Sequence, residues 1–108
     1  LVAGYGLGIV QRFLSRNPNV KNILTIEKFD KVIDECKKVY GKIYGNVKIS
    51  DFFRYKGDKK FDVVIGDVWK DIIPESLEDY KRFKYKSQKL VKPNGRILAW
   101  GKIFLNIS

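Results

Sequence analysis

The first ten residues, Leu1–Val10, constrain the fold more than any other stretch of the sequence. Their sequence, LVAGYGLGIV, is a short apolar run, then three alternating glycines, then residues at helical spacing. Glycine permits a positive backbone φ angle and lets a ligand approach the main chain where a Cβ atom would collide. At the start of a helix, peptide N–H groups and the helix dipole then face that ligand. The stretch therefore predicts a strand, a glycine-rich loop and a helix that together bind a nucleotide-type cofactor.

The remainder of the 108-residue chain alternates between strand and helix patterns. β-branched and apolar runs predict four more strands, at residues 21–26, 46–49, 61–66 and 96–101. Helical spacing predicts helices that follow Gly8, Asp30 and Pro74. Five strands separated by helices favour an α/β fold over residues 1–108. We expect one domain with a doubly wound, mainly parallel Rossmann-like sheet, strand order 3-2-1-4-5, and helices on both faces.

Each predicted helix has one largely apolar side, which we expect to face the sheet. In the first helix this side comprises Ile9, Val10, Phe13 and Leu14, while Gln11, Arg12, Ser15 and Arg16 face solvent. In the second helix it comprises Val32, Ile33, Cys36, Val39 and Tyr40. In the third helix it comprises Leu77, Tyr80, Lys84, Ser87 and Val91. Cys36 is therefore expected to be a core residue rather than a nucleophile.

Acidic residues follow three of the predicted strands, namely Glu27, Asp51 and Asp67. In open α/β sheets, ligands bind outside the carboxyl ends of the strands, so we expect these acids and the glycines to converge on one crevice. Glu27 follows Gly6 by about the interval at which an acid binds ribose hydroxyls in dinucleotide folds. The alternative for Glu27 is a solvated acid at a strand end.

A nicotinamide-binding loop would have its third glycine at position 9, where this chain has Ile9. With Gly4, Gly6 and Gly8 in strict alternation, the loop instead resembles the first motif of class I S-adenosylmethionine-dependent methyltransferases. It is also similar to that of the spermidine synthase branch, which has the same fold. Segments 25–33, 49–52, 61–67 and 90–98 resemble later motifs of this family, in order.

The resemblance implies S-adenosylmethionine as the cofactor and a role for each matched residue. The implied cofactor-binding residues are Gly4, Tyr5, Gly6 and Gly8 around the methionine moiety, Glu27 on ribose, Lys28 and Phe29 flanking adenine, Ser50, Asp51 and Phe52 at the adenine amino group, and Asp67 beside the reacting centre. Asp67 is also the implied catalytic residue. Tyr5 and Trp69 are expected to offer aromatic walls to the cationic centre.

The chain also departs from the family pattern. Val2 stands where most methyltransferases have an acid, and the stretch Asp67-Val68-Trp69-Lys70 matches no acceptor-specific motif. The family's last two strands are missing, so we expect a fragment or an incomplete core. The methyl acceptor, small molecule or macromolecule, stays open. So do two other functions: aminopropyl transfer, and cofactor binding without catalysis.

Composition limits the partners and the compartment. A net charge of +10, from 22 basic and 12 acidic residues, is compatible with RNA binding, and Lys81–Lys86 is the densest basic patch. The alternative is a lysine-rich solvated surface. Without histidine and with a single cysteine, the sequence predicts no Cys/His metal site and no internal disulfide. No run is long enough for a membrane span, and we expect a cytoplasmic protein.

Overall fold

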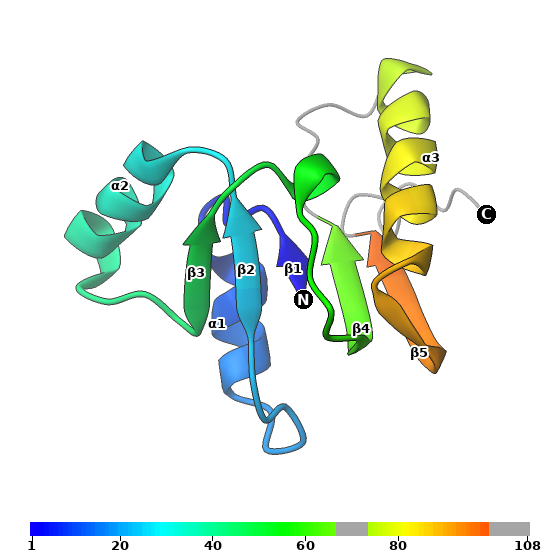
Figure 1. Cartoon of the computed structure of the whole chain (residues 1–108). Helices are drawn as coiled ribbons and strands as arrows, with labels where there is room; N and C mark the ends of the chain where they lie inside the picture. The colour runs from blue at the N-terminus through cyan, green and yellow to red at the C-terminus, as the bar shows by residue number, and fades with distance from the viewer. Residues whose placement is uncertain (67–73, 100–108) are drawn as a thin grey trace. The chain divides into compact units, whose positions relative to one another are not determined.

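The computed structural model describes residues 1–66 and 74–99 (Figure 1). Its strands are β1 (Val2–Ala3), β2 (Leu24–Glu27), β3 (Asn46–Ile49), β4 (Phe61–Gly66) and β5 (Val91–Ala99). Its helices are α1 (Ile9–Ser15), α2 (Asp30–Tyr40), α3 (Pro74–Gln88) and the short 3₁₀ helix η1 (Phe52–Arg54). The strands belong to one sheet in the order β3-β2-β1-β4-β5, which confirms the predicted Rossmann-like α/β fold. The chain divides into two compact units, Leu1–Tyr55 and Lys56–Ser108, and the expected single domain over 1–108 stays a prediction.

Three parallel strands form the sheet of the first unit. Val2 pairs with Thr25 in β2, and β2 continues in register with β3 up to the pair of Glu27 with Ile49. Main-chain hydrogen bonding extends one residue further, because the Ser50 N–H group donates to the Glu27 carbonyl at 2.9 Å. The carboxyl ends of β1, β2 and β3 therefore lie at one edge, as the sequence predicts.

Helix α1 presents a different side to the sheet from the one its apolar residues predict. Val10 and Gln11 are buried, whereas Ile9 and Phe13 are 54% and 67% exposed. The expected inward side was therefore wrong for Ile9, Phe13 and Gln11. Gln11 Nε2 donates to the Gly4 carbonyl at 3.2 Å and to Thr25 Oγ1 at 3.0 Å. These bonds compensate for burial of the amide NH₂ group, whereas the buried Oε1 atom has no hydrogen-bond partner among the described residues.

Helix α2 packs through its first two turns. Ile33 and Cys36 are buried together with Tyr5, so the core position predicted for Cys36 is confirmed. The prediction was wrong for Val39 and Tyr40, which are 70% and 41% exposed. The last turn of α2 extends beyond the residues it packs against and is therefore exposed to solvent.

In the second unit, β4 and β5 are parallel with one irregularity. Phe61 pairs with Val91, but Val63 pairs with Arg96, so β5 carries extra residues between the two pairs. The predicted turn Pro93-Asn94-Gly95 thus lies inside β5 as a bulge rather than before it. A Cβ atom on Gly95 would lie only 2.4 Å from the Val91 side chain, so the bulge requires glycine.

Helix α3 buries Phe83 and Ser87, which are one turn apart. Lys84 is exposed, contrary to its predicted inward position, because Phe83 occupies the inward side instead. The Phe83 ring covers Gly66 at the end of β4, where a Cβ atom would approach it to 2.7 Å. No helix within residues 1–66 and 74–99 is long and apolar enough to cross a membrane.

Candidate cofactor site

The glycine loop adopts the backbone conformation that its composition predicts. Gly4, Gly6 and Gly8 have φ angles of 93°, 55° and 76°. Gly8 is the N-cap of α1, and its N–H group donates to the Tyr5 carbonyl at 2.8 Å. A Cβ atom on Gly8 would lie 2.7 Å from Tyr5 Cε1. The first turn of α1 has neither a side-chain cap nor an acidic residue, so its positive end is not neutralised from within the helix.

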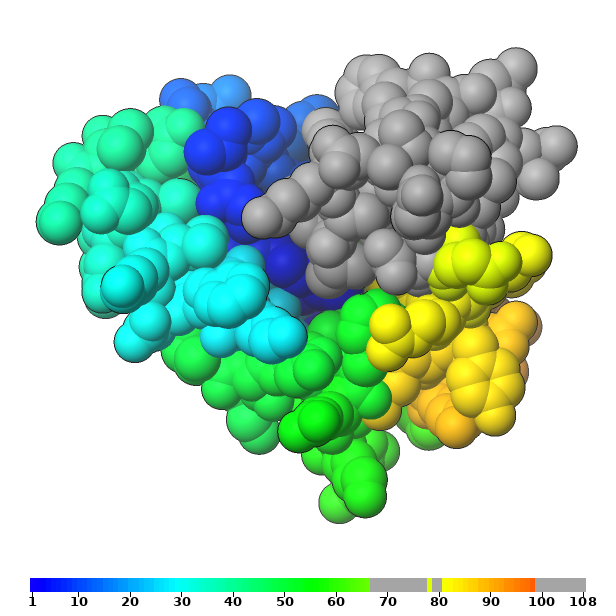
Figure 2. Space-filling model, turned by 90° about the horizontal axis from the view of Figure 1, so that it is seen from above, coloured from blue at the N-terminus to red at the C-terminus, as the bar shows by residue number. Residues whose placement is uncertain are grey.

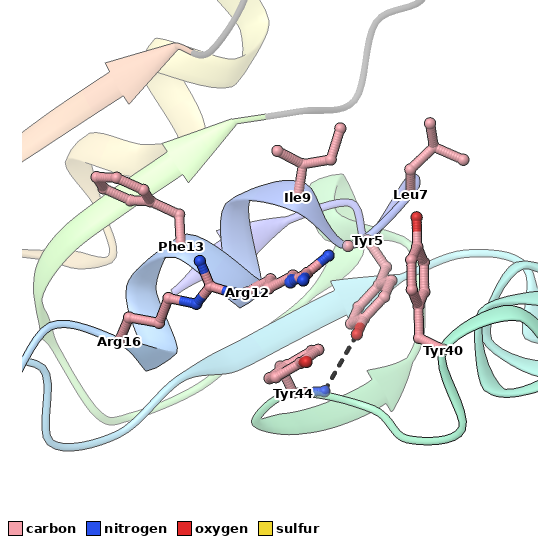
Figure 3. Close-up of a pocket in the computed structure, with 9 residues that line it drawn as sticks. Tyr5, Leu7, Ile9, Arg12, Phe13, Arg16, Tyr40 and Tyr44 are labelled. Carbon is pink, nitrogen blue, oxygen red and sulfur yellow. Dashed lines mark hydrogen bonds between the residues drawn. The ribbon is translucent and has the colours of Figure 1, made fainter.

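The Tyr5 side chain anchors this loop in the core of the first unit. Its ring is 1% exposed and packs with Ile33 and Cys36. Its hydroxyl oxygen accepts a hydrogen bond from the Tyr44 N–H group at 3.1 Å (Figure 3). Burial raises the pKa of Tyr5, so the phenol stays protonated. A ring buried in this way does not form the aromatic wall expected of it.

Glu27 joins the glycine loop to the start of α2. Its side chain is buried, and Oε1 accepts a hydrogen bond from the Tyr5 N–H group at 2.8 Å. Oε2 accepts from the Phe29 N–H group at 2.9 Å. Figure 2 shows the start of α2 (cyan) beside the loop segment (blue) at the surface. The carboxylate therefore lies next to the loop, as predicted, and each oxygen retains a second lone pair for a ligand.

The end of β3 is more open. Asp51 is half-buried, and its Oδ1 accepts a hydrogen bond from the Phe53 N–H group at 2.9 Å, which caps η1. Ser50 is also half-buried and bonds through its main chain to the end of β2. Phe52 is buried and makes an edge-to-face contact with Phe53, with ring centroids 5.6 Å apart. Of these three predicted site residues, Ser50 and Asp51 are accessible and Phe52 supports them from the core.

Two predicted adenine-flanking residues follow Glu27 directly and are exposed. The Phe29 side chain is 58% exposed. The Lys28 ammonium group lies 5.7 Å from the centroid of that ring. A free aromatic face beside a buried acid is suited to stacking on a planar ligand.

Cys36 is a contact of the glycine loop that the sequence did not predict. Its Sγ lies 3.4 Å from the Gly6 carbonyl oxygen, to which the thiol donates. Burial raises the pKa of Cys36, and the negative charges of Glu27 and Glu35 raise it further. The thiol therefore stays protonated and continues to donate to the loop. Helical spacing placed Cys36 inward, but it could not name the carbonyl group that the thiol meets.

Asp67 and Trp69 lie outside the described residues, so their expected roles stay predictions. Within residues 1–66 and 74–99, no group of three or more His, Cys, Asp or Glu side chains could hold a metal ion. The geometry described above thus comes from the first unit alone. It consists of the glycine loop, the buried Glu27 and the half-buried Asp51.

The fold is that of S-adenosylmethionine-dependent methyltransferases of known structure. One such enzyme, from Clostridium acetobutylicum ATCC 824, superposes with a TM-score of 0.64 at 16% identity, over 90% of this chain and 40% of its own. A DhpI–SAM–HEP complex superposes with a TM-score of 0.66 at 19% identity, over 89% and 42%. A putative methyltransferase from Thermoplasma acidophilum gives 0.57 at 19% identity, over 87% and 39%.

The chain spans about two fifths of the length of these solved structures. No protein-family model matches the sequence. A comparison with curated proteins also gives no match. At identities below 20%, the likeness establishes the fold, and the function has to be argued from the residues of this chain.

Proposed function

We propose that this chain binds S-adenosylmethionine and supplies the cofactor-binding part of a methyltransferase. The observation that carries the proposal is the buried Glu27 carboxylate, which accepts hydrogen bonds from the Tyr5 and Phe29 amides. It fixes an acidic acceptor between the glycine loop and an exposed aromatic ring. Solved neighbours of the same fold include complexes of DhpI with SAM and with SAH, which supports this ligand over other nucleotides.

The residues present fit the parts of such a cofactor. The loop amides and the uncapped start of α1 suit the carboxylate of a methionine moiety. The two spare lone pairs of Glu27 suit the vicinal hydroxyls of a ribose. The exposed Phe29 ring, with Lys28 beside it, suits a stacked adenine. Asp51 uses Oδ1 for the η1 cap and keeps Oδ2 as an acceptor for the adenine amino group.

When bound, the cofactor would supply a methyl group activated by its sulfonium: the acceptor would bond to the methyl carbon as the carbon–sulfur bond breaks, and the sulfur would leave as a thioether with that electron pair. The protein's contribution is then alignment and exclusion of water rather than covalent chemistry. We propose that the glycine loop aligns the cofactor. Hydrogen bonds to Glu27 and from Cys36 fix this loop. Asp67 is proposed as the carboxylate that orients the acceptor or takes its proton.

Calorimetric titration with S-adenosylmethionine, its decarboxylated form and NAD, run in parallel on the 108-residue chain, tests the proposal. We expect S-adenosylmethionine to bind most tightly. Preference for the decarboxylated donor would favour aminopropyl transfer instead. Binding of NAD alone would contradict the proposal. Donor binding without turnover of any acceptor would indicate a cofactor-binding part that needs the rest of a longer enzyme.

Asp51→Asn isolates one contact in the same titration. Asparagine retains an oxygen for the Phe53 amide and caps helices as well as aspartate does, but loses the second acceptor. We expect S-adenosylmethionine affinity to fall about fivefold to tenfold, as for one hydrogen bond of about 1 kcal/mol. Asp34→Asn, on an exposed position of α2, makes the same charge change and should leave affinity unaltered. Equal affinities for both variants would remove Asp51 from the site.

A further inference from the structure

A groove lies between α1 and the C-terminal end of α2, within the first unit (Figure 3). It encloses about 400 Å³. Its lining residues are Tyr5, Leu7, Gly8, Ile9, Arg12, Phe13, Arg16, Tyr40 and Tyr44. In Figure 3 the side chains of Arg12 and Arg16 leave α1 on the side where Tyr40 and Tyr44 lie. Tyr5 and Gly8 of the glycine loop line the groove, whereas the candidate cofactor residues at the ends of β2 and β3 do not.

The groove is cationic. Arg12 and Arg16 are exposed, and they are one helical turn apart, about 6 Å along the axis. None of the lining residues is acidic. The ion pairs found within the described ranges join Lys38 to Glu35, Lys81 to Glu78, and Lys92 to Asp62, so neither arginine is neutralised in this way. Since the whole chain carries +10, an anionic ligand is the complementary one.

Aromatic rings stand beside these cations. Phe13 is 67% exposed and Tyr40 is 41% exposed. Tyr44 is half-buried, with the Lys42 ammonium group 4.7 Å from its ring centroid. Cations that track a phosphate backbone, combined with free rings on which bases stack, are the recurring means of binding single-stranded nucleic acid.

We propose that this groove binds single-stranded nucleic acid, with Arg12 and Arg16 on phosphates and Phe13 and Tyr40 on bases. In a duplex the bases are already stacked on one another, so they are not free to stack on Phe13 and Tyr40. The inference does not depend on the cofactor proposal, because it uses a different set of side chains. It also moves the expected nucleic-acid contact away from the patch Lys81–Lys86.

That patch has fewer exposed rings than its sequence suggests. Phe83 is fully buried and cannot stack on a base. Tyr85, at 65% exposed, is therefore the one exposed ring of the patch, and the Lys89 ammonium group lies 4.5 Å from its centroid. Lys81 is paired with Glu78 at 3.6 Å. The α1 groove is therefore the better candidate, and the patch provides matched controls.

Fluorescence anisotropy with labelled oligouridine and oligothymidine of twelve nucleotides, and with a duplex of equal length, tests the proposal at several salt concentrations. We expect both single strands to bind and the duplex to bind more weakly. Tighter binding of oligouridine or of oligothymidine would show whether the groove prefers RNA or DNA. Equal or tighter binding of the duplex would overturn the proposal, as would no binding at low salt.

Variants separate the groove from the general positive charge. The double variant R12Q/R16Q should lower the slope of log Kd against log salt by about 1.4, since each lost phosphate contact accounts for about 0.7 on a single strand. The double variant K31Q/K59Q removes the same charge at exposed positions outside the groove and should change the slope far less. Equal effects of the two double variants would mean diffuse attraction and would overturn the proposal.

Ring removal tests stacking separately from charge. F13A and Y40A should each weaken single-strand binding about fivefold or more, while Y85A should not. All three side chains are exposed, so the folded state tolerates their loss. If F13A and Y40A bind the strands like the wild type, the groove is not the site. If these variants instead lose binding only to phosphatidylserine vesicles, the groove is a membrane contact and the proposal fails.

Discussion

Glu27 at the end of β2 and Asp51 at the end of β3 occupy equivalent places in the fold, yet the protein uses them differently. Glu27 is buried, and main-chain amides from two separate segments engage both of its oxygens. Asp51 is half-buried, and among residues 1–66 and 74–99 the Phe53 amide is the group found to bond to its carboxylate, through Oδ1. The first acid joins the glycine loop to the start of α2, while the second is the one that we propose to engage a ligand.

A position at the end of a strand therefore does not by itself define the role of an acidic residue. A buried carboxylate must be compensated by strong hydrogen bonds, because an isolated charge is costly away from water. Glu27 meets that requirement with amides of the glycine loop and of the α2 entry. The half-exposed Asp51 has no such requirement, so it remains available. Substitutions at the two strand ends test this contrast between Glu27 and Asp51.

The largest effect is expected from Glu27→Gln. Glutamine presents one oxygen and one NH₂ group to two main-chain N–H donors. One N–H group therefore loses its acceptor, and the other bonds to a neutral amide oxygen instead of a charged carboxylate oxygen. We expect the free energy of unfolding to fall by about 3 kcal/mol, measured by urea denaturation. Glu35→Gln, at an exposed position of α2, should change it by less than about 0.5 kcal/mol. A stable E27Q protein would show that Glu27 is not a structural clip.

The next effect concerns the loop that Glu27 holds. Gly8 and Gly41 both have a φ angle of 76°, but a Cβ atom on Gly8 would meet Tyr5 at 2.7 Å, whereas on Gly41 it would meet nothing within 4 Å. G41A should therefore cost only the left-handed backbone penalty, about 1 kcal/mol. G8A adds a steric penalty and should cost about 2 to 3 kcal/mol. Equal thermal unfolding of the two variants would contradict the packing of Tyr5 under Gly8.

A smaller effect is expected at alkaline pH. The pKa values of Tyr5 and Cys36 are raised in the folded protein by burial, so the unfolded chain loses these protons first as pH rises. Their contribution to stability is full below about pH 9 and declines above it. Cys36→Ala should make the decline in unfolding free energy shallower, by at most about 1.4 kcal/mol per pH unit. An unchanged pH slope would contradict a buried, neutral thiol beside Gly6.

The smallest effect on stability is expected from Asp51→Asn. Asparagine keeps the bond to the Phe53 amide, so the free energy of unfolding should stay within about 0.5 kcal/mol of the wild type. Urea denaturation beside E27Q gives the comparison directly. A loss of 2 kcal/mol or more would mean that both acids serve the fold and that Asp51 is not reserved for a ligand.

Much of the fold could be predicted because its signals are local. The bounds of β3 and β4, the helix after Gly8 and the positive φ angles of the loop all follow from residue type and spacing. The inward side of α1 could not be predicted in this way. Hydropathy ranks Phe13 above Gln11 for burial, but two hydrogen bonds to neighbouring segments make Gln11 the buried one.

The sequence predicts which residues lie at the candidate site, but it does not predict the hydrogen bonds that join them. Sequence spacing predicts that Glu27 lies near the glycines. Its hydrogen bonds to the Tyr5 and Phe29 amides depend on the tertiary structure and have no signal in the sequence. The contact of Cys36 with Gly6 likewise joins residues that are far apart in sequence. Such contacts have no local pattern, so they emerge only from the folded chain.

We propose that the carboxyl ends of β1, β2 and β3 bind S-adenosylmethionine. Two-dimensional ¹H–¹⁵N NMR of the 108-residue chain during titration with this cofactor tests it most directly. We expect the largest amide shifts at Gly6, Gly8, Phe29 and Phe53, with little change at Tyr85. Saturable shifts confined to other amides, or no shifts at millimolar cofactor, would contradict it.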